Sequence, residues 1–176
     1  MTQDSFITPL ESAVSTPGAF TLTPVHVAHA RLLAATHHIC FTEPWTEQAF
    51  AELCLSPGCF GFIVEGMTGS GGNVPRRQPV GPQPVGMVMA RVAADEAEIL
   101  TIAVLPPARR SGAGKILMQA ALREAMARGA HSMFLEAAVT NDAALKMYYS
   151  LAFTSVGRRK AYYANGIDAL VLRREM

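Results

Sequence analysis

Apolar residues along this chain repeat with two periods, one typical of β-strands and one typical of α-helices. Short apolar runs predict strands at residues 20–23, 60–65, 85–94, 99–105, 132–139, 154–158 and 168–173. Apolar positions three or four residues apart predict helices at residues 24–40, 46–55, 113–128 and 141–151. The short link between 85–94 and 99–105 makes these strands antiparallel, whereas the helix between 99–105 and 132–139 makes those two parallel. The pattern therefore predicts an α/β fold with a mixed sheet.

Two segments fall outside this pattern. Residues 1–18 are polar, contain Pro9 and Pro17 and show no sustained period, so we expect a loose N-terminal arm. Residues 66–84 are rich in glycine and proline, which predicts a flexible insertion within a hairpin of strands. The remaining sequence, residues 19–176, is long and apolar enough for one core and predicts a single domain.

The segment after strand 99–105 carries the clearest sign of a binding site. Pro106 and Pro107 remove two backbone donors, so the strand must end there. Residues 109–114, Arg-Arg-Ser-Gly-Ala-Gly, then combine two guanidinium groups with glycines and an immediate helix start. Free N–H groups and the positive end of the helix dipole favour an anion, so this loop predicts a phosphate or pyrophosphate site.

Two common phosphate motifs do not fit this loop. A P-loop requires glycine where Arg109 stands and Ser or Thr where Ile116 follows Lys115. A dinucleotide-binding turn requires a third small residue, and Leu117 occupies that place. An ordinary glycine-containing turn remains an alternative to the anion site.

Composition narrows the class of protein. The formal net charge is +1 at pH 7, which provides no broad field for binding nucleic acid. Apolar runs are far shorter than the roughly 20 residues of a membrane span, and no signal-like segment opens the chain. Three cysteines without a Cys-x-x-Cys pair favour a reducing, cytoplasmic compartment, and five histidines without compact spacing indicate no metal site.

Several short motifs are spread over most of residues 21–173. They are Phe41-x-x-Pro44-Trp45-Thr46, Ile102-Ala103-Val104-x-Pro106, Arg109-x-x-Gly112-x-Gly114, Leu135-Glu136, Asn141-x-x-Ala144, Tyr148-x-Ser150-Leu151-x-Phe153 and Tyr162-Tyr163. Together they resemble the GNAT acetyltransferase superfamily, and most closely its ribosomal-protein-alanine N-acetyltransferase branch. One departure is Ala152, which stands where relatives usually have glycine and suggests a strained helix exit.

The resemblance implies a fold and a co-substrate. The GNAT fold is a mixed, mostly antiparallel sheet with a central splayed pair of parallel strands, flanked by helices. The co-substrate is acetyl-CoA, without a metal, and its pantetheine arm is expected to pair with the backbone of the strand that ends at Pro106. The expected cofactor-binding residues are Ile102, Ala103, Val104, Arg109, Arg110, Ser111, Gly112, Ala113, Gly114, Lys115 and Asn141. A helix cap alone would also explain Asn141.

The resemblance also implies two catalytic residues. Glu136 is the expected base, acting through water because a carboxylate with a reference pKa of about 4 is a poor direct base for an amine. Tyr148 is the expected proton donor to the departing thiolate, and its neighbour Tyr149 is the rival. Each residue could instead have a purely structural role. Glu136 could be a carboxylate that pairs with an arginine or accepts hydrogen bonds from backbone N–H groups, and Tyr148 could be a core residue.

The acceptor is expected to be the N-terminal α-amine of a protein, first of all the N-terminal alanine of a small-subunit ribosomal protein. Trp45 and the pair Tyr162-Tyr163 are expected to form opposite walls of a peptide groove, with Glu43 attracting a basic residue. Stapling the following helix through Phe50 is an equal alternative for Trp45. A small-molecule or polyamine acetyltransferase and an idle acetyl-CoA-binding module stay open, and we expect a monomer or weak dimer.

Overall fold

The structure, a computed structural model, describes residues 20–66, 82–164 and 166–176. The predicted N-terminal arm and most of the predicted glycine- and proline-rich insertion therefore lie outside the described residues. Strands reach into the predicted insertion from both sides, because Gly66 and residues 83–84 belong to strands.

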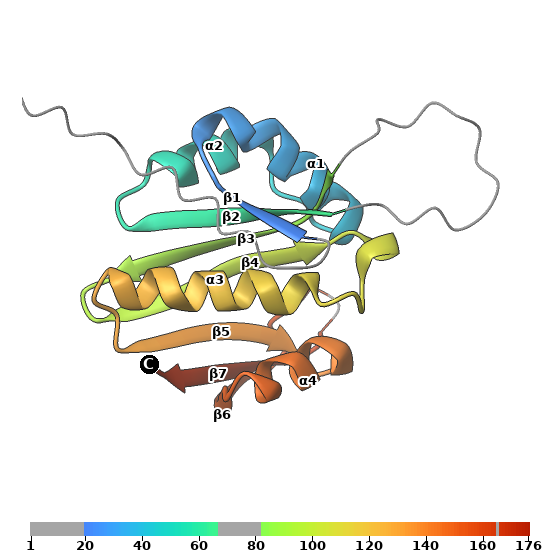
Figure 1. The fold of residues 1–176 in the computed structure, drawn as a ribbon. Helices are drawn as coiled ribbons and strands as arrows, with labels where there is room; N and C mark the ends of the chain where they lie inside the picture. The colour runs from blue at the N-terminus through green and yellow to red at the C-terminus, as the bar shows by residue number, and fades with distance from the viewer. Residues whose placement is uncertain (1–19, 67–81, 165) are drawn as a thin grey trace, which may run out of the picture.

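The described residues form a seven-stranded sheet with the strand order β1-β2-β3-β4-β5-β7-β6 (Figure 1). Its neighbouring strands are antiparallel except for β4 and β5, which are parallel, as the sequence predicted. The strands are β1 (Phe20–Pro24), β2 (Cys59–Gly66), β3 (Gln83–Ala93), β4 (Glu96–Val104), β5 (Ser132–Ala138), β6 (Thr154–Arg159) and β7 (Ala169–Glu175).

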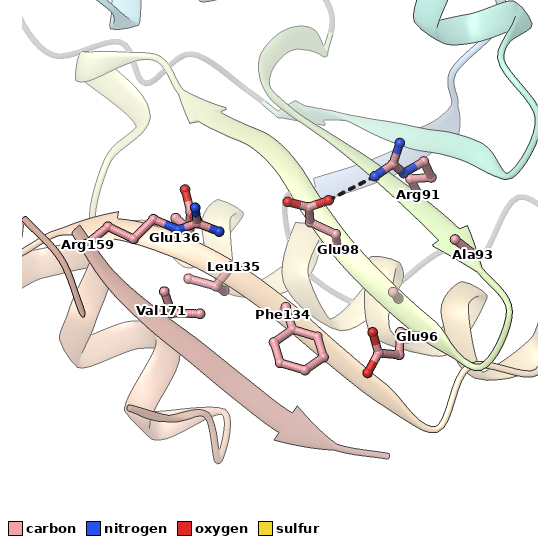
Figure 2. Close-up of a pocket in the computed structure, with 10 residues that line it drawn as sticks. Arg91, Ala93, Glu96, Glu98, Phe134, Leu135, Glu136, Arg159 and Val171 are labelled. Carbon is pink, nitrogen blue, oxygen red and sulfur yellow. Dashed lines mark hydrogen bonds and ion pairs between the residues drawn. The ribbon is translucent and has the colours of Figure 1, made fainter. Parts of the chain in front are cut away.

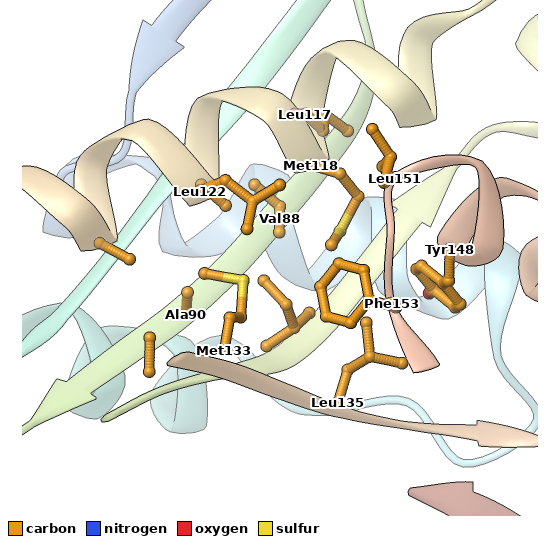
Figure 3. Packing of buried hydrophobic residues seen from close by; sticks show 14 of the residues in the cluster. Val88, Ala90, Leu117, Met118, Leu122, Met133, Leu135, Tyr148, Leu151 and Phe153 are labelled. Atoms are coloured by element: carbon orange, nitrogen blue, oxygen red, sulfur yellow. The ribbon is translucent and has the colours of Figure 1, made fainter. Parts of the chain in front are cut away.

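Four α-helices flank the sheet: α1 (Ala30–Cys40), α2 (Glu47–Leu55), α3 (Ala113–Ala127) and α4 (Asp142–Ser150). One core cluster joins α3 and α4 to the sheet, and in Figure 3 Leu117, Met118 and Leu122 of α3 point toward Met133 and Phe153. A smaller cluster joins α1 and α2 to alternate residues of β2, β3 and β4. Because side chains alternate between faces of a strand, the two helix pairs cover opposite faces of the sheet.

The ends of three helices confirm the sequence analysis. The Thr46 side chain accepts a hydrogen bond from Ala49 N and caps α2, and the Asn141 side chain accepts one from Ala144 N and caps α4. Arg128 is the C-cap of α3, and Gly129 follows at a left-handed φ of 89°. Glu124 and Arg128 form an ion pair at 2.8 Å along the last turn.

The start of the first helix was predicted wrongly. Strand β1 extends through Pro24, a 3-10 turn follows at Val27–His29, and α1 begins only at Ala30. Ile39, an apolar residue near the end of this helix, is 59% exposed. The buried side of α1 contains Leu33 and, four residues later, His37.

The exit of α4 is strained as the departure from the family pattern suggested. Ala152 has a left-handed φ of 62°, a conformation that costs a residue with a Cβ about 1 kcal/mol or more. Tight backbone bonds hold this turn, because Ala152 N donates to the Tyr149 carbonyl and Phe153 N to the Tyr148 carbonyl. The turn brings Phe153 back against the ring of Tyr148.

Candidate active site

The parallel pair at the centre of the sheet separates along its length. Strands β4 and β5 pair only through residues 96–98 and 132–134. Beyond them β4 continues to Val104 and β5 to Ala138, and β5 pairs over its full length only with β7 on its other side. A register shift in β3–β4, which leaves Leu100 between the partners of Met89 and Ala90, bends β4 near this point. The splayed pair expected from the resemblance is therefore present, and its open edge can accept an extended ligand.

Glu136 lies on β5 shortly after Phe134, the last residue of β5 that pairs with β4. Its Oε1 atom lies 2.5 Å from Nε of Arg159, which is the last residue of β6. The Glu136 carboxylate also raises the pKa of Tyr162, first through a side-chain hydrogen bond. Pairing with an arginine agrees with the non-catalytic interpretation of Glu136 given above. The catalytic role of Glu136 therefore remains a proposal.

A hollow of about 270 Å³ opens beside Glu136 on the sheet face opposite α3 (Figure 2). Side chains that alternate with the buried core residues of β4 and β5 reach it, among them Glu96, Glu98 and Phe134. Arg91 of β3 pairs with Glu98 across the hollow's edge at 3.3 Å. Helices α1 and α2 cover the β2–β4 part of this face, so the hollow lies where their cover ends.

Tyr148 is 5% exposed, and its ring packs edge-on against Phe153 with the centroids 6.0 Å apart. Burial, followed by the nearby Tyr163, raises the pKa of its hydroxyl well above the usual value. Tyr149, the rival proton donor, is 47% exposed on the outside of α4. Tyr163 also responds to Glu136, because burial and then that carboxylate's charge raise its pKa. The two predicted catalytic residues therefore share Tyr163 as an electrostatic neighbour.

The predicted anion loop has the backbone that a phosphate requires. Arg110 and Gly112 have left-handed φ angles of 62° and 97°, and such alternation turns successive N–H groups toward one side. Gly112 is the N-cap of α3, Ser111 Oγ accepts a hydrogen bond from Ala113 N at 3.4 Å, and the first turn holds no acidic residue. A Cβ at Gly112 would meet only open space. Binding of a coenzyme pyrophosphate by this loop remains a prediction.

Other predicted cofactor residues have contacts within the chain. Nε of Arg109 donates to the Val104 carbonyl at 3.1 Å, which folds its side chain back over the strand end. A Cβ on Gly114 would lie 3.2 Å from the Met147 sulfur, so glycine here permits close packing of α3 on α4. The cap formed by Asn141 explains that residue without a ligand. The contacts of these three residues with coenzyme A remain predictions.

The two predicted walls of the peptide groove, Trp45 and the Tyr162-Tyr163 pair, pack against different parts of the protein. Trp45 packs on Phe50 as the predicted staple, with ring centroids 5.6 Å apart, and lines a separate hollow along α2. The Tyr162 and Tyr163 rings pack edge-on at 5.2 Å after β6. Among the described residues, no recorded contact joins Trp45 or Glu43 to this tyrosine pair, so their common groove remains a prediction.

Sequence reasoning missed two residues, Arg159 and His37. The contact of Arg159 with Glu136 depends on the pairing of β5 with β7 and of β7 with β6. His37 is 3% exposed and accepts a hydrogen bond from Trp45 N at Nδ1, at 3.1 Å. Its ring stacks between Phe41 and Trp45, and burial lowers its pKa. The available signal was the position of His37 four residues after Leu33 and four before Phe41, which places it beside apolar neighbours on a helix.

Within the described residues, no group of three or more His, Cys, Asp or Glu side chains is arranged to hold a metal ion. No helix in that part of the chain is long and apolar enough to cross a membrane.

Comparison with known protein families decides which fold family this geometry represents. The model of the acetyltransferase (GNAT) family matches residues 31–153. The chain belongs to this family. The matched GNAT segment contains the splayed strands, the anion loop, Glu136 and Tyr148, whereas Arg159 and the tyrosine pair lie beyond it.

The curated relatives include ribosomal-protein-alanine N-acetyltransferases. The chain is 36% identical over 75 residues to the [ribosomal protein bS18]-alanine N-acetyltransferase of Salmonella typhimurium, covering 43% of this chain and 51% of that protein. It is 29% identical over 134 residues to a putative enzyme of the same name from Bacillus subtilis, covering 75% and 80%. The match to the first relative thus spans about half of its length.

Solved structures confirm the GNAT fold. The crystal structure of the ribosomal-protein-S18-alanine N-acetyltransferase from Escherichia coli superposes with a TM-score of 0.72 at 24% identity, covering 89% of this chain and 93% of that one. The spermidine/spermine N-acetyltransferase SpeG from Vibrio cholerae superposes with a TM-score of 0.67 at 18% identity, covering 89% and 92%. Because both identities are low, these likenesses concern the fold.

Proposed function

We propose that this GNAT protein transfers the acetyl group of acetyl-CoA to the N-terminal α-amine of a protein, with the alanine terminus of a small-subunit ribosomal protein as the first candidate. The observation that carries the proposal is the position of Glu136 at the separation of β4 and β5, beside an open hollow. The curated relatives named for the same reaction support it. An acceptor of this kind implies a cytoplasmic reaction.

Acetyl transfer to an α-amine requires only modest acid–base catalysis from the protein. The amine nitrogen attacks the thioester carbonyl, a C–N bond forms, and the C–S bond then breaks to release the thiol of coenzyme A. A free α-amine has a pKa of about 8, so near neutral pH it needs only modest help to lose a proton. Glu136 receives that proton through water. Tyr148, kept protonated by its burial, supplies a proton to the departing sulfur.

A preference for α-amines follows from this modest base. The ε-amine of lysine has a pKa of about 10.4 and is far harder to deprotonate at pH 7. A second candidate, a polyamine acetyltransferase, is favoured by one observation: three carboxylates, those of Glu96, Glu98 and Glu136, line the hollow. Polycationic amines would be attracted to such a surface.

A panel of acceptors tests the proposal. Peptides beginning with Ala-Arg, the same peptides with a blocked N-terminus and one lysine, and spermidine are compared by the thiol released from acetyl-CoA. We expect the highest kcat/KM with the free N-terminal peptide. Faster turnover of spermidine or of the lysine peptide would replace the proposal with the small-amine alternative. Acetyl-CoA binding without thiol release from any acceptor would indicate an idle binding module.

A further inference from the structure

We propose that Arg159 controls acceptor affinity as an exchangeable counter-ion: its guanidinium neutralises Glu136 when no acceptor is bound and competes with the acceptor's ammonium group for that carboxylate. The inference rests on the proposed function, because it assumes that an amine is delivered to Glu136.

The geometry of the ion pair places Arg159 on the solvent side. The side chain of Glu136 is 18% exposed in the wall of the hollow, whereas that of Arg159 is 61% exposed. In Figure 2 the guanidinium extends across the end of the hollow to the carboxylate. A cation approaching Glu136 from solvent therefore meets Arg159 first and must take over its 2.5 Å charge-assisted contact.

The side chain of Arg159 is held by few groups. Among the described residues its recorded partners are Glu136 and the ring of Tyr162, whose centroid lies 5.7 Å from the guanidinium carbon. Strand β6, which it ends, is exposed along its length. The preceding residue anchors the turn instead, because Arg158 pairs with Asp168 at 2.6 Å and Asp168 also accepts from Ala161 N. Arg159 can therefore swing away while the backbone of the turn stays in place.

The other charged groups around Glu136 do not replace Arg159 as its main ionic partner. Across the hollow, Glu98 is paired with Arg91, and Glu96 lies farther along β4. Tyr162 and Tyr163 have raised pKa values and are neutral near pH 7. Removing Arg159 thus leaves the Glu136 carboxylate with the hydrogen bond of neutral Tyr162 and removes one positive charge from the approach.

These contacts predict a change in acceptor binding. At pH 7 an α-amine with a pKa of about 8 is mostly an ammonium ion, which the guanidinium repels. Arg159→Ala should therefore lower the acceptor KM, and exposed ion pairs worth up to about 1 kcal/mol correspond to roughly a threefold to fivefold change. The KM for acetyl-CoA should stay unchanged. The gain should shrink at pH 9, where most acceptor molecules are neutral.

Steady-state kinetics with an Ala-Arg-starting peptide tests the inference on the full chain. Arg159→Lys keeps the positive charge and should retain a KM near that of the unmodified protein. Lys160→Ala is the matched control, because it removes the neighbouring positive charge from an exposed residue without a recorded contact to Glu136. An acceptor KM that is unchanged or raised in Arg159→Ala, or lowered equally in Lys160→Ala, would overturn the inference.

The Glu136→Gln variant distinguishes a failure of the counter-ion inference from a failure of the proposed function. If the unmodified protein is active, Glu136→Gln is impaired and Arg159→Ala behaves like the unmodified protein, the counter-ion role is wrong while the proposed function stands. If the unmodified protein acetylates no amine, the proposed function fails and the inference fails with it.

Discussion

Tyr148 illustrates how one side chain can belong to both the core and the chemistry. Its ring fills the cluster beside Phe153, while burial raises the pKa of its hydroxyl. A hydroxyl held protonated across the working pH range can act as a general acid, and removing such a group typically costs a factor of 10²–10⁴ in rate.

Tyr148→Phe should therefore lower kcat by roughly 100-fold while leaving the fold intact, because the ring and its packing remain. Acetyl-CoA affinity, measured by calorimetry, should change little. Tyr149→Phe, one residue away and exposed, is the matched control and should keep full activity. Equal rates in both variants would reduce Tyr148 to a core residue.

His37 makes a different kind of prediction, since its Nδ1 atom must be unprotonated to accept the Trp45 N–H. Burial lowers its pKa from the reference 6.5, so between the folded and unfolded pKa values the unfolded chain binds more protons. This contribution to stability is fully present above about pH 6.5 and is lost as the pH falls toward the folded pKa.

His37→Phe keeps an aromatic ring in the stack but leaves the Trp45 N–H without its acceptor, at a cost of about 1–3 kcal/mol. Urea unfolding should show that loss at pH 7.5 and a smaller loss at pH 5, where the unmodified protein has itself been destabilised. His38→Phe, on the exposed side of α1, should show neither effect. A loss independent of pH would assign His37 to packing alone.

The anion loop acts as an element, through its backbone rather than through any one side chain. Gly112 at the start of α3 and Gly129 after its end have similar left-handed φ angles, and a Cβ at either would meet open space. Alanine at either position strains the backbone equally, by about 1 kcal/mol. Only Gly112 borders the proposed pyrophosphate site.

Gly112→Ala and Gly129→Ala should therefore lower the free energy of unfolding by similar amounts. Acetyl-CoA affinity should fall roughly tenfold in Gly112→Ala alone, because relaxing the strain turns the N–H groups of the helix start away from the phosphates. Calorimetry on both variants measures this. Equal affinities would remove the loop from the coenzyme site.

The complete sheet is two strand groups joined through one short parallel pairing. Strands β1–β4 lie on one side and β5, β7 and β6 on the other, with β4 and β5 paired over residues 96–98 and 132–134. Helix α3 and its core cluster connect the groups on one face. A coenzyme bound where β4 and β5 separate would add contacts between the two strand groups at the place where few strand-pairing contacts join them.

Acetyl-CoA should therefore slow amide hydrogen exchange in two separate segments, residues 99–104 of β4 and the first turn of α3. Strand β6, at the far edge, should be unaffected and serves as the internal control. Protection of the helix start alone would show that the pantetheine arm does not lie along β4.

Local interactions determined much of this fold. The caps formed by Thr46 and Asn141, and the stop at Arg128-Gly129, each involve groups within a few residues, so a short stretch of sequence determines them. The parallel pair followed from a handedness rule. The helix start predicted directly after Gly112 is also confirmed, because α3 begins at Ala113.

Only the tertiary structure decided what surrounds Glu136. Its partner Arg159 lies 23 residues later on a strand that does not touch β5, and their contact requires the register of β5 on β7 and of β7 on β6, including a shift near Val156. The burial of His37 likewise depends on the packing of α1 against Trp45 and Phe50. Strand register and helix rotation are set by packing across the core, which no short stretch of sequence contains, whereas caps and turns are set by their own neighbours.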